Sequence, residues 1–400
     1  MKAVILAAGE GNRMRPLTYT RPKVMLPIAN KPILEHLLTE AGKAGVGEFI
    51  FVVGYHDEQV RDYFGSGDRW GVSIDYCTQR KQLGTADAVK MVEGLVDGNF
   101  LVINGDIVVN QKDINSLTSR SENTVSVVKV EDTKDFGVVE LREGKVVHIY
   151  EKVAKSPSHM ANAGLYLFTP AILDAISQTL KSPRGEYEIT DSLQLLIDQG
   201  GCISYQEIGY WLDLGYPWDL LSANEALLNG IESQNEGEVE ENVVMKGVVS
   251  IGKDTVIRSG SYIVGPVIIG RDCDIGPNCS IRPYTSIGDG CHIGSAVELK
   301  SSIIMRGSKI PHHNYVGDSI IGEECNFGAG TKIANLRLDK KDIWVAGMDT
   351  GRRKLGAIVG DRVETGINAS INVGSMIGNN THIGPGAVVS GVISPDSRIF

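Results

Sequence analysis

A six-residue period in the second half is the strongest constraint on how this 400-residue chain folds. A branched aliphatic residue returns at every sixth position, without a gap, at Ile251, Ile257, Ile263, Ile269, Ile275, Ile281, Ile287, Ile293 and Leu299. Glycine follows several of these positions, which marks a turn that repeats with each hexapeptide. The period returns at Ile371, Ile377, Ile383 and Val389. An ordinary strand alternates every two residues, so this pattern instead predicts a left-handed parallel β-helix with three hexapeptides per triangular coil.

Glycine usage separates this half from the rest of the chain. Of the 47 glycines, 24 lie in the 145 residues from Gly247 to Gly391, and the other 23 are spread over the remaining 255 residues. The segment just before the period is polar, rich in glutamate and without an apolar period. We therefore predict one domain over residues 1–230, a linker over residues 231–245 and a second domain over residues 246–400.

Charge and hydropathy limit the expected partners. The chain has 39 Lys and Arg against 49 Asp and Glu, a net charge of −10, and no long basic run, so we expect no nucleic-acid partner. The first apolar run, residues 3–8, is too short for a membrane span or a signal-peptide core. We expect no membrane contact and a cytoplasmic location.

The first half alternates short apolar runs with segments of helical apolar spacing. Strands are expected at residues 2–8, 48–53, 72–77 and 100–104, and helices at residues 32–43, 57–64 and 85–95. This alternation predicts a Rossmann-like α/β domain with a parallel sheet, whose ligands bind at the carboxyl ends of the strands.

A glycine-rich loop with nearby cations follows the first expected strand. Gly9 and Gly11 let backbone N–H groups approach phosphate oxygens, and Arg13 and Lys23 supply positive charge. The dinucleotide motif needs glycine where Met14 stands, and the Gly-Lys-Ser/Thr of a P-loop is absent. Taken alone, the loop is either a phosphate site or a glycine turn with surface cations.

Residues 6–14 and Arg21-Pro22-Lys23 resemble the signature of the sugar-1-phosphate nucleotidylyltransferases. The resemblance implies catalytic roles for Arg13 and Lys23, and Mg²⁺ held by Asp106 and Asp213. It implies nucleotide contacts, with UTP or dTTP, by Leu6, Ala8, Gly9, Gly11, Gln79, Gln82, Gly84 and Thr85. It implies contacts to the sugar phosphate by Gly137, Glu151, Lys152, Asn162 and Thr190. Val153 departs from the family, which has proline there.

Three segments of the second half resemble the acetyltransferase part of the bifunctional enzyme that makes UDP-N-acetylglucosamine. They are residues 298–300, 311–318 and 326–331. The resemblance implies that His312 is the general base, and that Lys300, Tyr315, Asn326 and Asn335 bind the amino-sugar-1-phosphate. Leu336 stands where bacterial relatives have tyrosine. The resemblance also implies acetyl-CoA as co-substrate and a homotrimer.

A basic segment interrupts the repeat between residues 334 and 357. It contains Arg337, Lys340, Lys341, Arg352, Arg353 and Lys354. Such a loop is either a solvated excursion or a contact for phosphates of coenzyme A or of the sugar, and Lys340 is the preferred candidate.

Four cysteines follow the register of the repeat. Cys273, Cys279, Cys291 and Cys325 each stand four residues after an apolar position, in a column of small side chains. We interpret them as packing residues, because cysteine behaves as a small hydrophobe and no C-x-x-C pair is present. A zinc site or a disulfide framework is the alternative.

The resemblance covers nearly the whole chain and is closest to archaeal-type bifunctional enzymes. It implies acetylation of glucosamine-1-phosphate and then transfer of UMP from UTP to the N-acetylated product. One alternative is a monofunctional thymidylyl- or uridylyltransferase acting on glucose-1-phosphate, whose β-helix is structural. Another is a non-catalytic regulatory subunit of the same architecture.

Overall fold

The structure, a computed structural model, describes residues 1–134, 136–151 and 157–400. Its contacts divide the chain into two compact units. The first comprises Met1–Glu10, Arg21–Met25 and Ile33–Asp213. The second comprises Gly11–Thr20, Leu26–Pro32 and Leu214–Phe400. Within the described residues, no helix combines the length and the apolar character that a membrane crossing needs.

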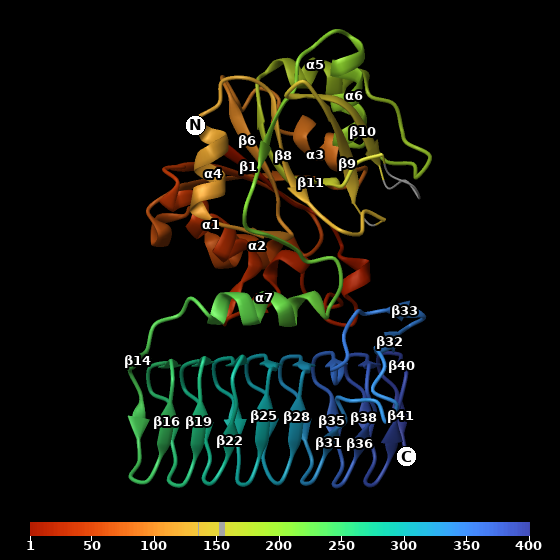
Figure 1. The fold of residues 1–400 in the computed structure, drawn as a ribbon. Coiled ribbons are helices and arrows are strands. Elements are labelled where there is room, and N and C mark those ends of the chain that lie inside the picture. Colours follow the sequence, from red (N-terminus) through yellow and green to blue (C-terminus); the bar gives the residue numbers. More distant parts are fainter. Residues whose placement is uncertain (135, 152–156) are drawn as a thin grey trace. The chain divides into compact units, whose positions relative to one another are not determined.

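A mixed β-sheet forms the centre of the first unit (Figure 1), in the order β5-β4-β1-β6-β11-β8-β12-β10-β9. Four neighbouring parallel strands are those that the sequence predicts, namely β1 (Lys2–Ala7), β4 (Glu48–Val53), β5 (Ser73–Thr78) and β6 (Phe100–Asn104). The other strands are β8 (Thr124–Lys129), β9 (Gly137–Arg142), β10 (Lys145–Glu151), β11 (Met160–Phe168) and β12 (Ser204–Glu207). The α/β class is confirmed.

Helices cover both faces of this sheet. The helices are α1 (Ile33–Lys43), α2 (Asp57–Phe64), α3 (Thr85–Lys90), α4 (Gln111–Thr118), α5 (Ala171–Gln178) and α6 (Ile189–Asp198). Alternate residues of β1 face opposite ways, so Ala3 and Ile5 pack with α1, α2 and α4, and Val4 packs with α3, α5 and α6. The helix α3 ends at Lys90, before the predicted Leu95, and turns follow up to Gly94 with φ +83°.

A second, two-stranded sheet lies beyond the end of β6. In it β7 (Ile107–Val109) pairs antiparallel with β13 (Trp211–Asp213), so that Asp213 stands opposite Ile107. The buried carboxylate of Asp113 accepts the backbone N–H groups of Gly209 (3.0 Å) and Tyr210 (2.9 Å), which fixes the chain just before β13.

The second unit is built on the predicted left-handed parallel β-helix, whose strands stack into three sheets (Figure 1). One face carries β14 (Gln234–Asn235), β17 (Val249–Ile251), β20 (Val267–Ile269), β23 (Thr285–Ile287), β26 (Ile303–Ile304), β29 (Ile320–Ile321), β34 (Ala357–Val359), β37 (Ser375–Ile377) and β40 (Val392–Ile393). The second carries β15 (Glu238–Val239), β18 (Val256–Ile257), β21 (Asp274–Ile275), β24 (His292–Ile293), β27 (Lys309–Ile310), β30 (Asn326–Phe327), β35 (Glu364–Thr365), β38 (His382–Ile383) and β41 (Arg398–Ile399). The third carries β16 (Val244–Lys246), β19 (Tyr262–Val264), β22 (Ser280–Ile281), β25 (Glu298–Lys300), β28 (Tyr315–Gly317), β31 (Lys332–Ile333), β36 (Ser370–Ile371) and β39 (Val388–Val389).

The length of a coil turn changes along this β-helix. Ile269 pairs with Ile287, 18 residues on, whereas Ile287 pairs with Ile304, only 17 residues on. The uninterrupted six-residue period therefore ends at Leu299 although the coil continues. A larger gap follows Ile333, which pairs with Ile371. Between them the chain leaves the coil as a small hairpin of β32 (Trp344–Val345) and β33 (Met348–Asp349).

The segment expected as a linker, residues 231–245, carries strands of the first coil turn, since β14 pairs with β17 and β15 with β18. The preceding helix α7 (Asp219–Leu228) also belongs to the second unit. Its buried Asn224 accepts hydrogen bonds from Ala29 N (2.8 Å) and Ser286 Oγ (2.9 Å) and donates one to Tyr284 O (3.1 Å).

The four coil cysteines are buried in the apolar interior of the β-helix, which confirms their packing role. Burial raises the pKa of all four thiols, that of Cys325 to about 12.

Candidate active sites

The loop after β1 begins at a buried and tightly bonded residue. The carbonyl of Ala8 accepts hydrogen bonds from Tyr55 N (3.2 Å) and from Gln82 Nε2 (3.3 Å). Leu6, two residues earlier, is half-buried. A side chain on Gly9, which follows Ala8, would meet open space. The backbone is thus anchored at the strand end and accessible directly after it, as an anion-binding loop requires.

Gly11 and Arg13 belong to the second unit. Gly11 has φ +65°, a conformation that favours glycine, and its carbonyl accepts a hydrogen bond from Thr18 Oγ1 (2.9 Å). The guanidinium of Arg13 lies 5.3 Å from the centre of the Tyr216 ring. This cation–π contact holds the side chain while leaving its N–H donors for an anion.

Lys23 lies beside the carboxylate at the end of β6. Its ammonium is 2.7 Å from Asp106 Oδ2, and the lysine is nearly fully buried. Asp213 pairs across the small sheet with Ile107, the residue that follows Asp106 in the chain. Mg²⁺ is typically held by one or two carboxylates together with substrate phosphates. The donor set fits that pattern, and the described residues contain no cluster of three metal-binding side chains that would hold a metal alone.

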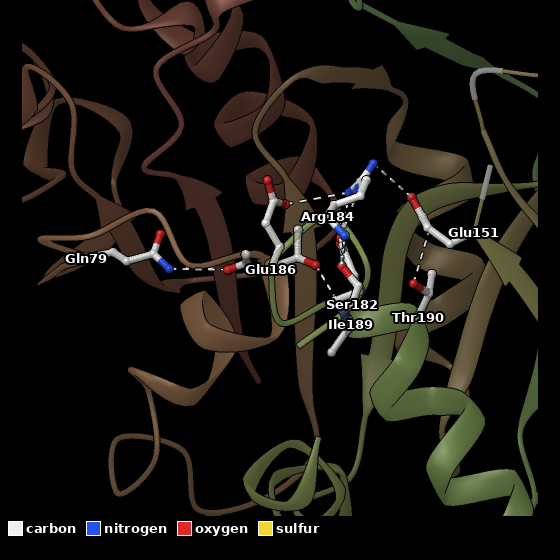
Figure 2. A network of polar contacts seen from close by, with 10 residues as sticks. Gln79, Glu151, Ser182, Arg184, Glu186, Ile189 and Thr190 are labelled. Carbon is white, nitrogen blue, oxygen red and sulfur yellow. Dashed lines mark hydrogen bonds and ion pairs between the residues drawn. The ribbon is translucent and has the colours of Figure 1, made fainter. Parts of the chain in front are cut away.

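The segment from Gln79 to Thr85, which is predicted to contact the nucleotide, is held by internal hydrogen bonds. Buried Gln79 donates from Nε2 to Asp87 Oδ2 (2.7 Å) and to Gly84 O (3.2 Å), and Figure 2 shows its side chain. Gly84 has φ +117°, and a Cβ there would lie 2.3 Å from the carbonyl oxygen of Tyr187. Only glycine permits this close approach.

The close approach of Gly84 to Tyr187 joins residues 79–85 to the chain before α6. Tyr187 N donates to Leu83 O (2.7 Å), and Ala86 N donates to Tyr187 O (2.9 Å). Thr85 Oγ1 accepts from Ile189 N (2.9 Å). The structure thus brings Gly84 and Thr85 next to the segment that carries Thr190.

Four of the five predicted sugar-side residues gather in one place. Thr190 Oγ1 donates to Glu151 Oε2 (3.2 Å). A Cβ on Gly137 would lie 3.1 Å from the same oxygen and 3.7 Å from both Asn162 and Thr190. The amide of Asn162 donates to the Tyr166 hydroxyl (2.8 Å). The fifth predicted residue, Lys152, lies outside the described residues, as does Val153.

Arg184 joins this group, and the sequence analysis missed it. Its guanidinium lies 2.6 Å from Glu188, 3.6 Å from Glu186 and 3.7 Å from Glu151. Figure 2 shows Arg184 between Glu186 and Glu151. The Glu188 side chain is only 5% exposed. Burial and the nearby Glu188 raise the pKa of Asp191. The available sequence signal was the spacing of Arg184 before two oppositely charged residues, Glu186 and Glu188.

In the β-helix, three predicted residues meet around Gly317. A Cβ on this glycine would lie 2.7 Å from Tyr315 Oη and 2.8 Å from Asn335 Nδ2. Lys300 stands beside Gly317 in the register of β25 and β28. A cation, a phenol and an amide therefore share one place on the third face of the coil.

The other predicted coil residues lie elsewhere on the surface. His312 is an exposed corner residue before β28, and its carbonyl accepts from Gly330 N (2.9 Å). Exposed Asn326 is on the second face, in β30. Lys340 lines a cavity of about 530 Å³ on the excursion, together with other charged residues and Trp344. Leu336 is partly exposed and bridges to Lys354.

Comparison with known proteins covers both units. Residues 2–230 match the nucleotidyl transferase family, and residues 263–372 match the GMPPB C-terminal domain family. The chain is 42% identical to the bifunctional protein GlmU of Methanococcus maripaludis over 406 residues, 100% of this chain and 97% of the relative. It is also 42% identical to the bifunctional sugar-1-phosphate nucleotidylyltransferase/acetyltransferase of Sulfurisphaera tokodaii, over 98% of this chain and 97% of that one. The chain belongs to this bifunctional GlmU family. It is therefore an enzyme with nucleotidyltransferase and acetyltransferase activity.

A solved structure is similar over part of this chain. It is that of a Bacillus anthracis protein described as a glucose-1-phosphate thymidylyltransferase, in complex with sucrose. The TM-score is 0.53 and the identity 30%, covering 59% of this chain and 98% of that one.

Proposed function

We propose that this chain makes UDP-N-acetylglucosamine in two reactions. It acetylates glucosamine-1-phosphate with acetyl-CoA, and it transfers UMP from UTP to N-acetylglucosamine-1-phosphate with release of pyrophosphate. The names of the full-length relatives support both reactions. The domains proposed to carry them are residues 1–230 and 246–400, and residues 231–245, expected from the sequence as a linker, form strands of the first coil turn.

In nucleotidyl transfer, a phosphate oxygen of the sugar phosphate attacks the α-phosphorus of UTP, and the bond to pyrophosphate breaks. The protein's task is positioning and charge neutralisation, so no covalent nucleophile is needed. Backbone N–H groups at Gly9 and Gly11 bind the triphosphate, and Arg13 and Lys23 neutralise the departing pyrophosphate. Asp106 and Asp213 hold Mg²⁺, which, when bound, neutralises charge on the phosphates.

The remaining residues of the first half select the substrates. Nucleotide contacts come from Leu6, Ala8, Gln79, Gln82, Gly84 and Thr85. Sugar-phosphate contacts come from Gly137, Glu151, Lys152, Asn162 and Thr190. The Glu151 carboxylate accepts hydrogen bonds from sugar hydroxyls, and Arg184 keeps that carboxylate in place.

In acetyl transfer, the amine nitrogen attacks the thioester carbonyl of acetyl-CoA, the C–S bond breaks and coenzyme A leaves. His312 takes the proton that the amine loses. Lys300, Tyr315 and Asn326 hold the sugar phosphate, Asn335 lies near the amine, and Lys340 binds phosphate. The observation that carries the proposal is the meeting of Lys300, Tyr315 and Asn335 at Gly317, because a coil serving only as a scaffold needs no such group.

We also propose that the chain acts as a homotrimer, with acetyltransferase sites between subunits. In support, a single chain leaves His312 and Asn326 exposed. Sedimentation analysis tests the assembly directly.

The deciding experiment measures coenzyme A release from acetyl-CoA and glucosamine-1-phosphate. His312→Ala is expected to lower the rate at least 100-fold, while the matched variant His313→Ala keeps the wild-type rate. Pyrophosphate release from UTP and N-acetylglucosamine-1-phosphate is measured in parallel and should be equal in all three proteins. No coenzyme A release with glucosamine- or galactosamine-1-phosphate would leave a monofunctional nucleotidylyltransferase with a structural β-helix.

A further inference from the structure

A buried carboxylate, Asp318, lies directly after β28 of the β-helix. It is only 6% exposed, yet it is a carboxylate at a coil corner. Its Oδ2 atom accepts a hydrogen bond from Lys300 Nζ (3.0 Å) and another from Asn335 Nδ2. One oxygen atom therefore holds the side chains proposed to contact opposite ends of the amino-sugar phosphate.

The backbone of Asp318 is fixed on both sides. Its N–H donates to Lys300 O (2.9 Å), and its carbonyl accepts from Gly356 N (2.8 Å). Its φ is +49°, a left-handed conformation that Asp and Asn adopt more easily than other non-glycine residues. The carboxylate thus leaves a hydrogen-bonded corner and accepts from the ends of the Lys300 and Asn335 side chains.

The fold itself does not require a carboxylate at this corner. The equivalent residue one turn earlier is Ser301, 17 positions before Asp318, with φ +44° and a matching hydrogen bond from its N–H to Pro283 O (3.1 Å). The same corner is therefore built there without any charge. A buried carboxylate costs free energy unless it is paired. The partners of Asp318 are Lys300 and Asn335, the two side chains proposed to bind the amino-sugar phosphate.

We infer that Asp318 is a positioning residue for acetyl transfer, which orients Lys300 toward the sugar phosphate and Asn335 toward the amine. This inference rests on the proposed acetyltransferase function. Since both donors share Oδ2, the separation between the phosphate-binding and amine-binding groups is set by one atom. The residue acts through Lys300 and Asn335 and does not itself touch the reacting atoms.

Asp318→Asn tests this with little change in volume or backbone preference. We expect the KM for glucosamine-1-phosphate to rise at least tenfold, the KM for acetyl-CoA to stay within twofold, and pyrophosphate release by the first half to stay unchanged. Asp318→Ser, which reproduces the Ser301 corner, should give the same split, so a folding defect in one variant does not decide the result. The charge control is Asp289→Asn, a half-exposed coil carboxylate paired with Arg271, which should leave both KM values unaltered.

A double-mutant comparison separates positioning from coil stability. In a Lys300→Met background the added Asp318→Asn change should raise the KM for glucosamine-1-phosphate much less than in the wild type, because one of its two targets is gone. A KM for glucosamine-1-phosphate within twofold of wild type in both Asp318 variants, or an equal rise in both backgrounds, would overturn the positioning role of Asp318. The proposed acetyltransferase function would still stand. If the wild-type protein fails to acetylate any amino-sugar phosphate, the proposed function falls and the inference falls with it.

Discussion

The two candidate sites are assembled by different rules. In the first unit, Lys23 meets Asp106 across 83 positions and Glu151 meets Thr190 across 39, so each contact depends on strand order and on the packing of helices. In the β-helix, Lys300 meets Gly317, and Asp318 meets Asn335, at the constant spacing of 17 residues. A sheet site is thus a product of the whole core, whereas a coil site is a product of one repeating register. Each site should therefore fail without the other.

The largest effect expected from this comparison is that of Asp213→Ala. Losing one of two carboxylates for Mg²⁺ removes several kcal/mol of charge stabilisation, which corresponds to about a 10³-fold slower release of pyrophosphate. Acetyl transfer should be unchanged. The measurement is a magnesium titration of pyrophosphate release, in which the variant needs more metal than the wild type.

The control for this variant is Asp198→Ala, an exposed carboxylate at the end of α6. It should retain the wild-type magnesium dependence. If Asp213→Ala also retained it, Asp213 would have no part in holding the metal.

Adding a methyl group at Gly317 should impair acetyl transfer alone, the reverse of the effect expected for Asp213→Ala. In Gly317→Ala the new Cβ would lie within 2.8 Å of both Tyr315 Oη and Asn335 Nδ2, so these side chains must move. Displacement of positioning groups by about 1 Å can cost about 100-fold in rate. We expect such a loss in coenzyme A release with unchanged pyrophosphate release. An equal loss of both activities would show that the two sites do not fail separately.

The sequence predicted the coil with little help from tertiary structure. A period of six fixes which residues face inward as far as Leu299, whereas the roles of Lys300 and Tyr315 came from the resemblance of their segments to the acetyltransferase family. It did not reveal the shortened turns, because the loss of one residue per turn looks like the end of the repeat. Asp318 was therefore seen only as part of a motif, and its bonds to Lys300 and Asn335 came from the structure.

Arg184 illustrates the limit of sequence analysis in the first unit. Its contacts to Glu151 and Glu188 depend on the path of the chain before α6, and no local pattern fixes that path. In contrast, the strand ends at Ala8 and Asp106 were predictable, since carboxyl ends of parallel strands share one edge of a sheet.

Removing Arg184 should have a moderate effect. In Arg184→Ala the buried Glu188 loses its closest ionic partner, and Glu151 loses a restraint. A charge-assisted hydrogen bond contributes about 1.5 kcal/mol or more when buried, and the 42% exposure of Arg184 argues for the low end of that range. We expect about a tenfold rise in the KM for N-acetylglucosamine-1-phosphate, with the KM for UTP unchanged. A rise in the KM for UTP alone would assign Arg184 to the nucleotide instead.

The smallest effect on activity is expected from chemical labelling of the cysteines. The order in which they are labelled compares the two units. Thiolates react with iodoacetamide, and burial both raises the pKa of the four coil thiols and blocks access to them. In the native protein at pH 8, mass spectrometry should find exposed Cys202 labelled first and half-buried Cys77 later, because burial and the Asp75 carboxylate raise the Cys77 pKa. The coil cysteines should become labelled only in denaturant, with both activities intact before that point. Early labelling of Cys325 would mean that the coil opens locally, and the constant register that assembles its site would then not be rigid.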